Sequence, residues 1–224
     1  MKKEGERVVV ERHHIGIRFL HWLIFLEGVV LGITGLQLGG LYSVSITEQV
    51  WMIHVVVGLA LICSCAALVY YLLATNEFRW FSIRRIPLSI KFFIKEFKAW
   101  FGIGPAVEEP IIYDKEKKEY VEKLIPSVII VWWVYVVLGL IIIITGLTMA
   151  FPNVFSFFYI FGDFLAPIFG GGEYSVIRAL HRFSSYLLAS VVIMHSYAVW
   201  VFKCLRSMVF GDRAEPVKER AKER

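Results

Sequence analysis

Four of the six histidines in this sequence lie within segments that are long enough and apolar enough to cross a lipid bilayer. His181 and His195 are fourteen residues apart on one segment, and His21 and His54 lie near the ends of two others. A histidine inside a membrane is costly and usually functional, and neutral imidazole is a common axial ligand of haem iron. The four residues therefore predict two bis-histidine haem sites. The alternative is that single histidines serve as hydrogen-bond partners between helices.

Four apolar segments carry these histidines, at residues 18–38, 50–74, 125–151 and 176–202. Each matches or exceeds the roughly 20 residues that span a bilayer as a helix, and 58% of the chain is hydrophobic. Backbone groups in lipid must be satisfied internally, which favours helices. We interpret the first segment as a retained helix rather than a signal peptide, because no small-residue cleavage pattern follows it. The sequence predicts one all-α domain over residues 1–224, an integral membrane four-helix bundle.

Lysine and arginine are distributed unevenly between the loops. Of 24 such residues, five lie at or before Arg18, ten lie within 79–123, and seven lie from Lys203 onward, whereas stretches 39–49 and 152–175 contain none. Because cytoplasmic loops carry an excess of basic residues, both termini and the middle loop are predicted to be cytoplasmic, in a multi-pass protein of the cytoplasmic membrane. This bias and anionic lipid headgroups account for the net charge of +5. No nucleic-acid partner is predicted.

The direction of each segment sets the depth of its histidine. The first segment runs outward, so His21 lies near the cytoplasmic face, whereas His54 begins the returning segment and lies near the outer face. His181 also lies near the outer face, and His195 lies about 21 Å deeper at about 1.5 Å per residue. Fourteen residues are close to four helical turns, so both histidines share a side of the helix. Depth therefore pairs His54 with His181 and His21 with His195.

Small residues give weaker support to a cofactor site. A ridge of glycines on the first segment ends at Gly35, and both a flat macrocycle and close helix packing need such a surface. The pairs Thr34-Gly35 and Thr145-Gly146 occur in the first and third segments and indicate a similar packing device in each. No Cys-x-x-Cys-His pattern for covalent haem attachment is present.

Charged residues lie close to the predicted ligands. Arg18, Arg178 and Arg182 are each within four residues of one of the histidines. Arginine at the membrane boundary is suited to pair with haem propionates, and the alternative is a snorkelling side chain. Glu27 is the only carboxylate deep within a segment. Both a proton relay to a reduced quinone and a structural role stay open for it.

The residues around the histidines resemble those of a known family. The matching stretches are Arg18–Trp22, Ile53–Gly58, Leu180-His181 and Met194–Tyr197. They resemble the cytochrome b (gamma) subunit of respiratory formate dehydrogenases, which is related to the cytochrome b of membrane-bound nickel–iron hydrogenases. The resemblance covers nearly the whole chain. It implies an electron-transfer subunit that holds two b-type haems, anchors an iron–sulfur subunit and a catalytic subunit, and passes electrons to menaquinone.

The chain differs from this family before the third segment. Formate dehydrogenase-like members carry a polar Asn-x-Gly-Gln-Lys stretch there, beside the quinone, whereas this chain reads Ile-Pro-Ser-Val-Ile over residues 125–129. Tyr120, Glu122 and Lys123 lie just before it and are candidate replacements. An alternative to the formate dehydrogenase-like assignment is therefore that the chain is the cytochrome b subunit of a hydrogenase or a sulfur-compound reductase. Electrons would then flow from quinol outward.

Three loop stretches carry further predictions. Residues 88–101 place apolar side chains on one side and lysines on the other, which predicts an amphipathic cytoplasmic helix and favours lipid anchoring over partner binding. The charged run Asp114–Lys123 is predicted to be a solvated turn or helix entry. The outer stretch 152–175 is rich in Phe and Gly. It is either a cap and docking surface for an extracytoplasmic iron–sulfur partner, or an interfacial re-entrant or amphipathic segment.

A haem-free bundle is the alternative from another class of protein. In that case the chain is a membrane anchor or a small transporter, and its histidines serve helix contacts or proton transfer. A reduced-minus-oxidised absorption spectrum distinguishes the two classes, because only a cytochrome has b-type bands.

Overall fold

The computed structural model describes residues 7–42, 48–105, 107 and 110–217. It divides into two compact units, each built from segments that are distant in sequence. The predicted cytoplasmic location of the termini depends partly on basic residues in 1–6 and 218–224, which lie outside the described residues. The first unit draws on Met1–Arg18, Tyr71–Trp133 and His195–Arg224, and the second on Phe19–Tyr70 and Val134–Met194.

Four long apolar helices agree with the predicted segments to within three residues at each end. They consist largely of Leu, Ile, Val and aromatic residues, and a helix satisfies the backbone of such a segment in lipid. The helix that carries His181 and His195 is continuous between them, as the sequence predicts. The four are α1 (Ile15–Leu38), α2 (Val50–Ala74), α4 (Pro126–Ala150) and α7 (Glu173–Val201).

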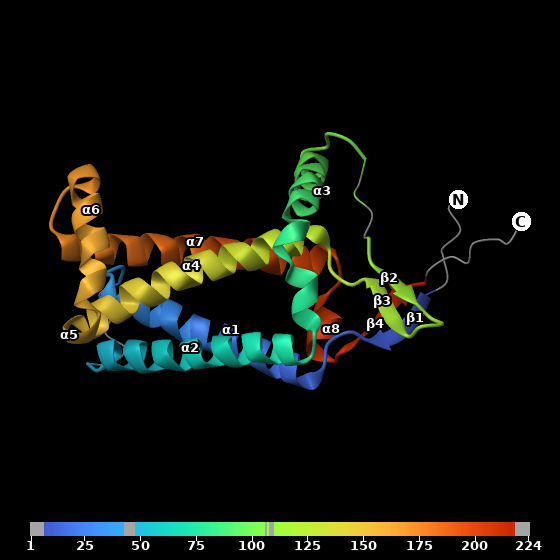
Figure 1. The fold of residues 1–224 in the computed structure, drawn as a ribbon, viewed down its shortest axis with the longest axis horizontal. Helices are drawn as coiled ribbons and strands as arrows, with labels where there is room; N and C mark the ends of the chain where they lie inside the picture. The colour runs from blue at the N-terminus through green and yellow to red at the C-terminus, as the bar shows by residue number, and fades with distance from the viewer. Residues whose placement is uncertain (1–6, 43–47, 106, 108–109, 218–224) are drawn as a thin grey trace, which may run out of the picture. The chain divides into compact units, whose positions relative to one another are not determined.

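A fifth stretch, Pro152–Phe169, is also long and apolar enough to cross a membrane. The structure therefore has five candidate spans among its described residues, where the sequence predicts four. The stretch is divided into α5 (Pro152–Phe155), a 3-10 turn η3 (Ser156–Phe158) and α6 (Tyr159–Phe169). Figure 1 shows α5 and α6 at the end of the second unit where α4 stops and α7 begins. The predicted outer loop is thus mostly helical.

Helix α6 packs tightly against the beginning of α7. A Cβ atom added to the buried Gly162 would lie 2.6 Å from the backbone carbonyl oxygen of Glu173, which is far inside van der Waals contact. The carboxyl group of the next residue, Asp163, lies beside that of Glu173. The middle of the fifth stretch is therefore fastened to the first residue of α7.

We expect Gly162→Ala to displace α6 from α7, because the neighbouring atom is backbone and has little freedom to move. Overpacking of this kind costs about 1–3 kcal/mol. Gly172→Ala is the matched control, since a Cβ at Gly172 has no neighbour within 4 Å. The thermal midpoint in detergent and protease cleavage within residues 152–172 are the measurements. Identical midpoints and cleavage patterns for the two variants would contradict the packing described for Gly162.

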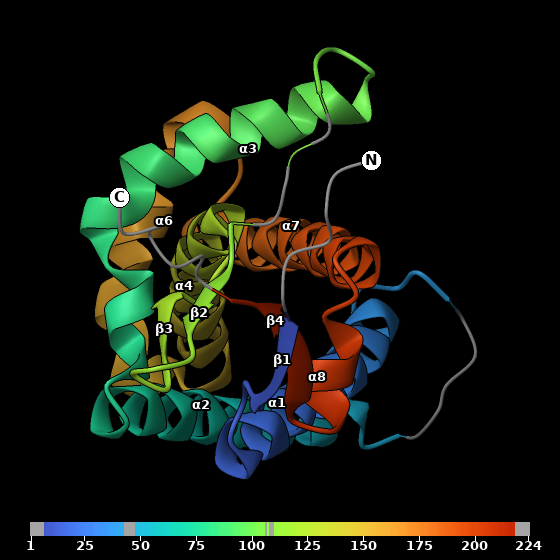
Figure 2. The same cartoon turned by 90° about the vertical axis from the view of Figure 1, so that its right-hand side faces the viewer.

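The first unit contains four short strands that the sequence analysis did not predict. β1 (Arg7–Glu11) pairs antiparallel with β4 (Asp212–Pro216), and β2 (Ile112–Asp114) pairs antiparallel with β3 (Glu119–Glu122). Figure 2 shows the two pairs and α8 beside β4. The helical class is confirmed, but the chain is not purely helical. The remaining elements of this unit are η1 (Glu77–Phe81), η2 (Ile83–Arg85), α3 (Ile86–Trp100) and α8 (Leu205–Val209).

The charged run Asp114–Lys123 is mainly a β-hairpin rather than a solvated turn or helix entry. Its tip bends through Lys118, which has a positive φ of 53°. The Asp114 side chain accepts hydrogen bonds from the backbone N–H groups of Glu116 and Lys117. This local hydrogen bonding favours a turn over a helix. Charge alone gave no signal of the flanking strands.

Buried charges hold the two ends of the described chain together. Arg12 is 5% exposed and donates to the fully buried carboxylate of Glu215 and, at 2.6 Å, to the carbonyl oxygen of Lys123. Arg213 lies 3.7 Å from the other carboxylate oxygen of Glu215. The Tyr120 hydroxyl donates to Glu215 at 3.4 Å, and burial beside this carboxylate raises the pKa of Tyr120. Two arginines thus compensate one buried carboxylate.

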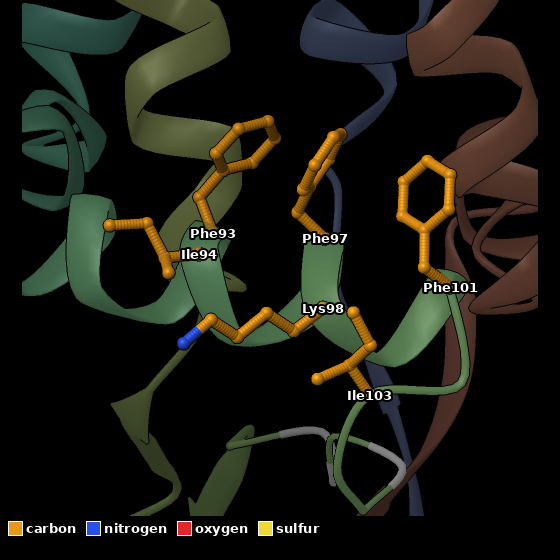
Figure 3. Close-up of a pocket in the computed structure, with 6 residues that line it drawn as sticks. All are labelled: Phe93, Ile94, Phe97, Lys98, Phe101 and Ile103. Atoms are coloured by element: carbon orange, nitrogen blue, oxygen red, sulfur yellow. The ribbon is translucent and has the colours of Figure 1, made fainter.

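Helix α3 (Ile86–Trp100) covers the stretch for which the sequence predicts an amphipathic helix. Figure 3 shows Phe93, Phe97 and Phe101 projecting from the same side, while the Lys98 side chain extends elsewhere. The Phe97 and Phe101 side chains remain well exposed. With Ile94 and Ile103, these residues line an apolar hollow. The arrangement is typical of a helix that lies in a membrane interface.

Candidate functional site

The second unit brings His54 of α2 together with His181 of α7. The centroids of the two imidazole rings are 6.4 Å apart, and the ring planes differ by 72°. Both side chains are partly buried. Two residues separated by 127 positions thus face each other within a bundle of apolar helices, at the ends that the sequence analysis placed near the outer face.

A threonine hydroxyl contacts each histidine from a neighbouring helix. Thr34 of α1 lies 2.8 Å from Nδ1 of His54, and Thr145 of α4 lies 3.0 Å from Nδ1 of His181. Nδ1 of His181 is also 3.1 Å from the carbonyl oxygen of Ile142. With Nδ1 engaged in this way, Nε2 is the nitrogen available to a metal.

A glycine follows each of these threonines and leaves room for the imidazole ring. A Cβ added to Gly35 would lie 3.3 Å from Cε1 of His54, and one added to Gly146 would lie 3.2 Å from Cε1 of His181. Such distances are tighter than ordinary carbon contacts. The Thr-Gly pairs, which the sequence analysis interpreted as a packing device, therefore form the walls against which the two rings lie.

The spacing of the two rings fits axial coordination of haem iron. Two metal–nitrogen bonds of about 2 Å, plus about 1 Å from each nitrogen to its ring centre, separate the centres by roughly 6 Å. The observed separation is 6.4 Å. No group of three or more His, Cys, Asp or Glu able to hold a metal ion occurs among the described residues. A haem takes its axial ligands from the protein, and the two facing imidazole rings match that requirement.

The other two predicted ligands lie in different units. His21 is in the second unit, where its ring meets Trp22 edge-on at 5.6 Å. His195 is in the first unit. Their pairing follows from depth along the helices and stays a prediction. His14, which lies before the first apolar segment, is exposed and lies 3.4 Å from the carboxylate of Glu11.

The three predicted propionate partners have different surroundings. Arg178 is exposed on α7. Arg182, one residue after His181, is exposed and its guanidinium lies 3.4 Å from the carbonyl oxygen of Gly39. Arg18, in the first unit, donates to the carbonyl oxygen of Val209 at 2.8 Å. Arg178 and Arg182 are thus exposed residues on the helix that carries His181, and Arg182, like Arg18, has a backbone acceptor.

The polar residues before α4 are engaged in other contacts. Lys123 forms an ion pair with Glu77 at 2.6 Å, and Glu122 forms one with Arg85 at 2.5 Å. Burial is the main cause that lowers the pKa of Lys123, while Glu77 opposes this shift. Tyr120 donates to a buried carboxylate, as described above. These three candidate replacements for the family's polar stretch thus already serve the structure of the first unit.

A buried carboxyl group that the sequence analysis passed over lies near the beginning of α4. Glu96 of α3 is 4% exposed and forms a side-chain hydrogen bond with Ser127. Burial raises the pKa of Glu96, and the bond to Ser127 partly offsets the rise. Glu96 lies among the lysines at 91, 95 and 98, so the sequence pattern gives no sign that it is buried.

Glu27 is held within the second unit by a hydroxyl of α2. Its Oε1 atom accepts a hydrogen bond from Ser64 at 3.0 Å, whereas its Oε2 atom is buried without a partner among the described residues. The Glu27 carboxyl group thus has a hydrogen bond at one of its two oxygen atoms. This geometry is compatible both with a proton relay to a quinone and with a structural role.

The fold and the histidine pair define a multi-pass helical membrane protein of the b-type cytochrome class. Residues 12–211 match the family model described as prokaryotic cytochrome b561. The chain therefore belongs to the prokaryotic cytochrome b561 family, which consists of membrane cytochromes that bind b-type haem and transfer electrons. A search of curated proteins gave no match. The family agrees with the resemblance carried by the histidine motifs.

Proposed function

We propose that the chain is the dihaem cytochrome b subunit of a respiratory oxidoreductase complex. His54 and His181 hold an outer haem, and His21 and His195 hold an inner one. The observation that carries the proposal is the facing pair His54/His181, with each Nδ1 engaged and the rings at the spacing of axial ligands. When bound, the haems supply one-electron redox chemistry, while the protein fixes their position and tunes their potential.

The properties of the fifth apolar stretch, Pro152–Phe169, favour a protein that crosses the membrane four times over one that crosses it five times. Helix α6 has 11 residues, about 16 Å at 1.5 Å per residue, which is roughly half of a bilayer core. It contains Pro167, and Gly162 in its first turn contacts Glu173, where α7 begins. A segment fastened there returns to the side from which it came. With four passes, the distribution of basic residues places both termini in the cytoplasm.

The order of electron carriers follows from this topology. An extracytoplasmic iron–sulfur subunit, itself bound to a catalytic subunit, delivers electrons to the outer haem, and the inner haem passes them to menaquinone. The α5–α6 segment is the proposed docking surface for the iron–sulfur subunit, because it lies at the end of the unit where α7 begins. Arg178 and Arg182 are suited to bind haem propionates there. The resemblance to the formate dehydrogenase gamma subunit supports this assignment.

A spectrum of the purified protein tests the proposal. Reduced-minus-oxidised difference spectra, with a pyridine haemochrome assay, are expected to give b-type bands and about two haems per chain. A protein that folds, inserts into membranes and contains no haem would overturn the proposal in favour of an anchor or transporter. Co-purification from native membranes then identifies the catalytic partner, and a hydrogenase or sulfur-compound reductase would replace the formate dehydrogenase-like assignment.

A quinone-site inhibitor is expected to perturb the spectrum of the inner haem only. Menaquinone is proposed to react near that haem, with protons taken up from the cytoplasm while electrons arrive from outside, so the reaction separates charge. Titration of the oxidised protein with the inhibitor, followed in the haem absorption bands, measures the effect. The outer haem is the internal control. A shift confined to the outer haem would contradict this placement of the quinone.

Helix α3 is proposed to anchor the chain to the cytoplasmic surface of the membrane. Its phenylalanine side, seen in Figure 3, suits the acyl-chain boundary, while Lys91, Lys95 and Lys98 suit anionic headgroups. Glu96 is turned toward the protein instead, through its bond to Ser127. The helix thus has one side for lipid and a buried contact with the beginning of α4.

A further inference from the structure

We propose that Thr34 and Thr145 are positioning residues that set the planes of the two axial imidazole rings of the outer haem site and hold them strongly crossed. The inference rests on the proposed haem site. It goes further, because it assigns a role to two residues that do not touch the iron and predicts a spectroscopic property of the cofactor.

The direction of each threonine hydrogen bond follows from its second contact. Thr34 Oγ1 lies 2.8 Å from the carbonyl oxygen of Val30, and Thr145 Oγ1 lies 2.6 Å from that of Ile141. A carbonyl oxygen only accepts, so the single hydroxyl proton goes to it. The hydroxyl oxygen then accepts from the histidine Nδ1–H. Both rings are thereby fixed as the tautomer with a free lone pair on Nε2.

The carbonyl oxygen of Ile142 supports the same tautomer for His181. It lies 3.1 Å from Nδ1 of that ring and has no proton to donate, so Nδ1 must be the donor. His181 is thus held by two acceptors on α4, whereas Thr34 is the acceptor found for His54. We therefore expect loss of Thr34 to release its ring more completely than loss of Thr145.

A hydrogen bond alone does not fix the rotation of an imidazole ring, but a second contact at the next atom does. Each threonine contacts Nδ1 of the ring, and the glycine that follows it lies against the adjacent ring atom, Cε1. A Cβ atom added to either glycine would be closer to Cε1 than an ordinary carbon contact. The same two-point clamp occurs on α1 for His54 and on α4 for His181. The two clamps leave the ring planes 72° apart.

Crossed axial rings have a consequence for low-spin ferric haem. Each imidazole donates π-electron density perpendicular to its own plane, so parallel rings split the two iron orbitals that accept it, whereas crossed rings leave them nearly equal in energy. Near-equal orbitals give an electron paramagnetic resonance signal with a strongly anisotropic low-field feature. The hydrogen bond at Nδ1–H also raises the basicity of the ligand, which favours the ferric state.

The test compares two valine substitutions on the same helix. Thr145→Val removes the clamp hydroxyl, whereas Thr148→Val removes a buried hydroxyl on the same helix whose hydrogen bond among the described residues goes to the carbonyl oxygen of Ile144. Thr34→Val is the equivalent change on α1, and Thr145→Ser restores a hydroxyl. Electron paramagnetic resonance of the oxidised full-length protein, redox titration and haem retention are the measurements.

We expect the wild-type protein to show the low-field signal. Thr34→Val and Thr145→Val should move one of the two haem signals toward the position of parallel rings and raise the potential of that haem. They should also weaken its retention on the order of 10–100-fold. Thr148→Val and Thr145→Ser should behave as wild type. A wild-type signal of the parallel type, or equal behaviour of Thr145→Val and Thr148→Val in a protein that holds haem, would overturn the clamp. Absence of any haem from the wild type would instead overturn the proposed function.

Discussion

Replacing either His54 or His181 with alanine is expected to lower the haem content from about two to about one per chain, and both variants should lose the same haem. The physical reason is that the two rings face each other at 6.4 Å, so the loss of either removes one axial ligand of a single site. His21→Ala and His195→Ala should each remove the other haem. Haem content and redox titration of each variant in membranes provide the measurement.

Double variants make the pairing testable without assigning spectral bands. The combination of His54→Ala with His181→Ala should lose no more haem than either single variant, because both act on one site. Combining His54→Ala with His195→Ala should remove both haems. His14→Ala, at an exposed histidine, is the matched control and should keep the full content. If the His54 and His195 variants lose a haem of the same potential, the pairing is wrong.

Substituting Glu215 with alanine is expected to destabilise the first unit by about 3–5 kcal/mol, the cost of leaving a buried charge without its partner. Glu215 is fully buried against Arg12, and Arg213 lies close by. Both guanidinium groups would lose their carboxylate. Because β1 and β4 flank this contact, the antiparallel pair should open at the same time. The free energy of unfolding in denaturant, followed by tryptophan fluorescence, gives the magnitude.

Glu119→Ala separates this effect from a general loss of negative charge. Glu119 lies on β3 and is exposed, so its removal should change stability by no more than about 0.5 kcal/mol. Limited proteolysis of sealed membranes should cleave near β1 in the Glu215 variant only. Equal stability and equal cleavage of the two variants would show that the buried network contributes nothing measurable.

The long helices and the outer histidine pair could be predicted because a lipid bilayer restricts the backbone structures that can cross it. Unbroken apolar runs must form helices, and charge bias with helical rise then sets the depth of each histidine. His54 and His181 were placed at one level by this reasoning alone. The inner pair rests on the same argument and awaits the substitutions proposed above.

The partners of these histidines were harder to predict. A threonine followed by glycine is common in packed helices, and nothing in the spacing of Thr145 reveals that its hydroxyl faces an imidazole on another helix. Hydrogen-bond direction depends on rotamers and helix rotation, which a sequence pattern does not contain. The sequence does contain one indication, which is a repeated pattern. Thr34-Gly35 lies on the helix before the one that carries His54, and Thr145-Gly146 lies on the long helix before the one that carries His181.

The strands were missed for a different reason. Residues 7–11 and 212–216 each hold only five residues and pair across almost the entire chain, so no local pattern joins them. Their charged side chains resemble those of ordinary membrane flanks. Asp114–Lys123 was likewise interpreted through its charge, although its turn is set by the short side chain of Asp114. Non-local strand pairing explains the first case, and local hydrogen bonding by a side chain explains the second.

The pairing of β1 with β4 has a consequence for biosynthesis. Glu11 and Asp212 are partners about 200 residues apart, so at about 5–20 residues per second β1 leaves the ribosome about 10–40 s before β4 exists. All the long apolar helices are translated within that interval. Arg12 stays without its carboxylate until the last of them is complete. Closure of this strand pair therefore marks a product in which all the long apolar helices have been translated, and a product that stops before Asp212 exposes an unpaired strand and an uncompensated cation to the proteases that remove incomplete proteins.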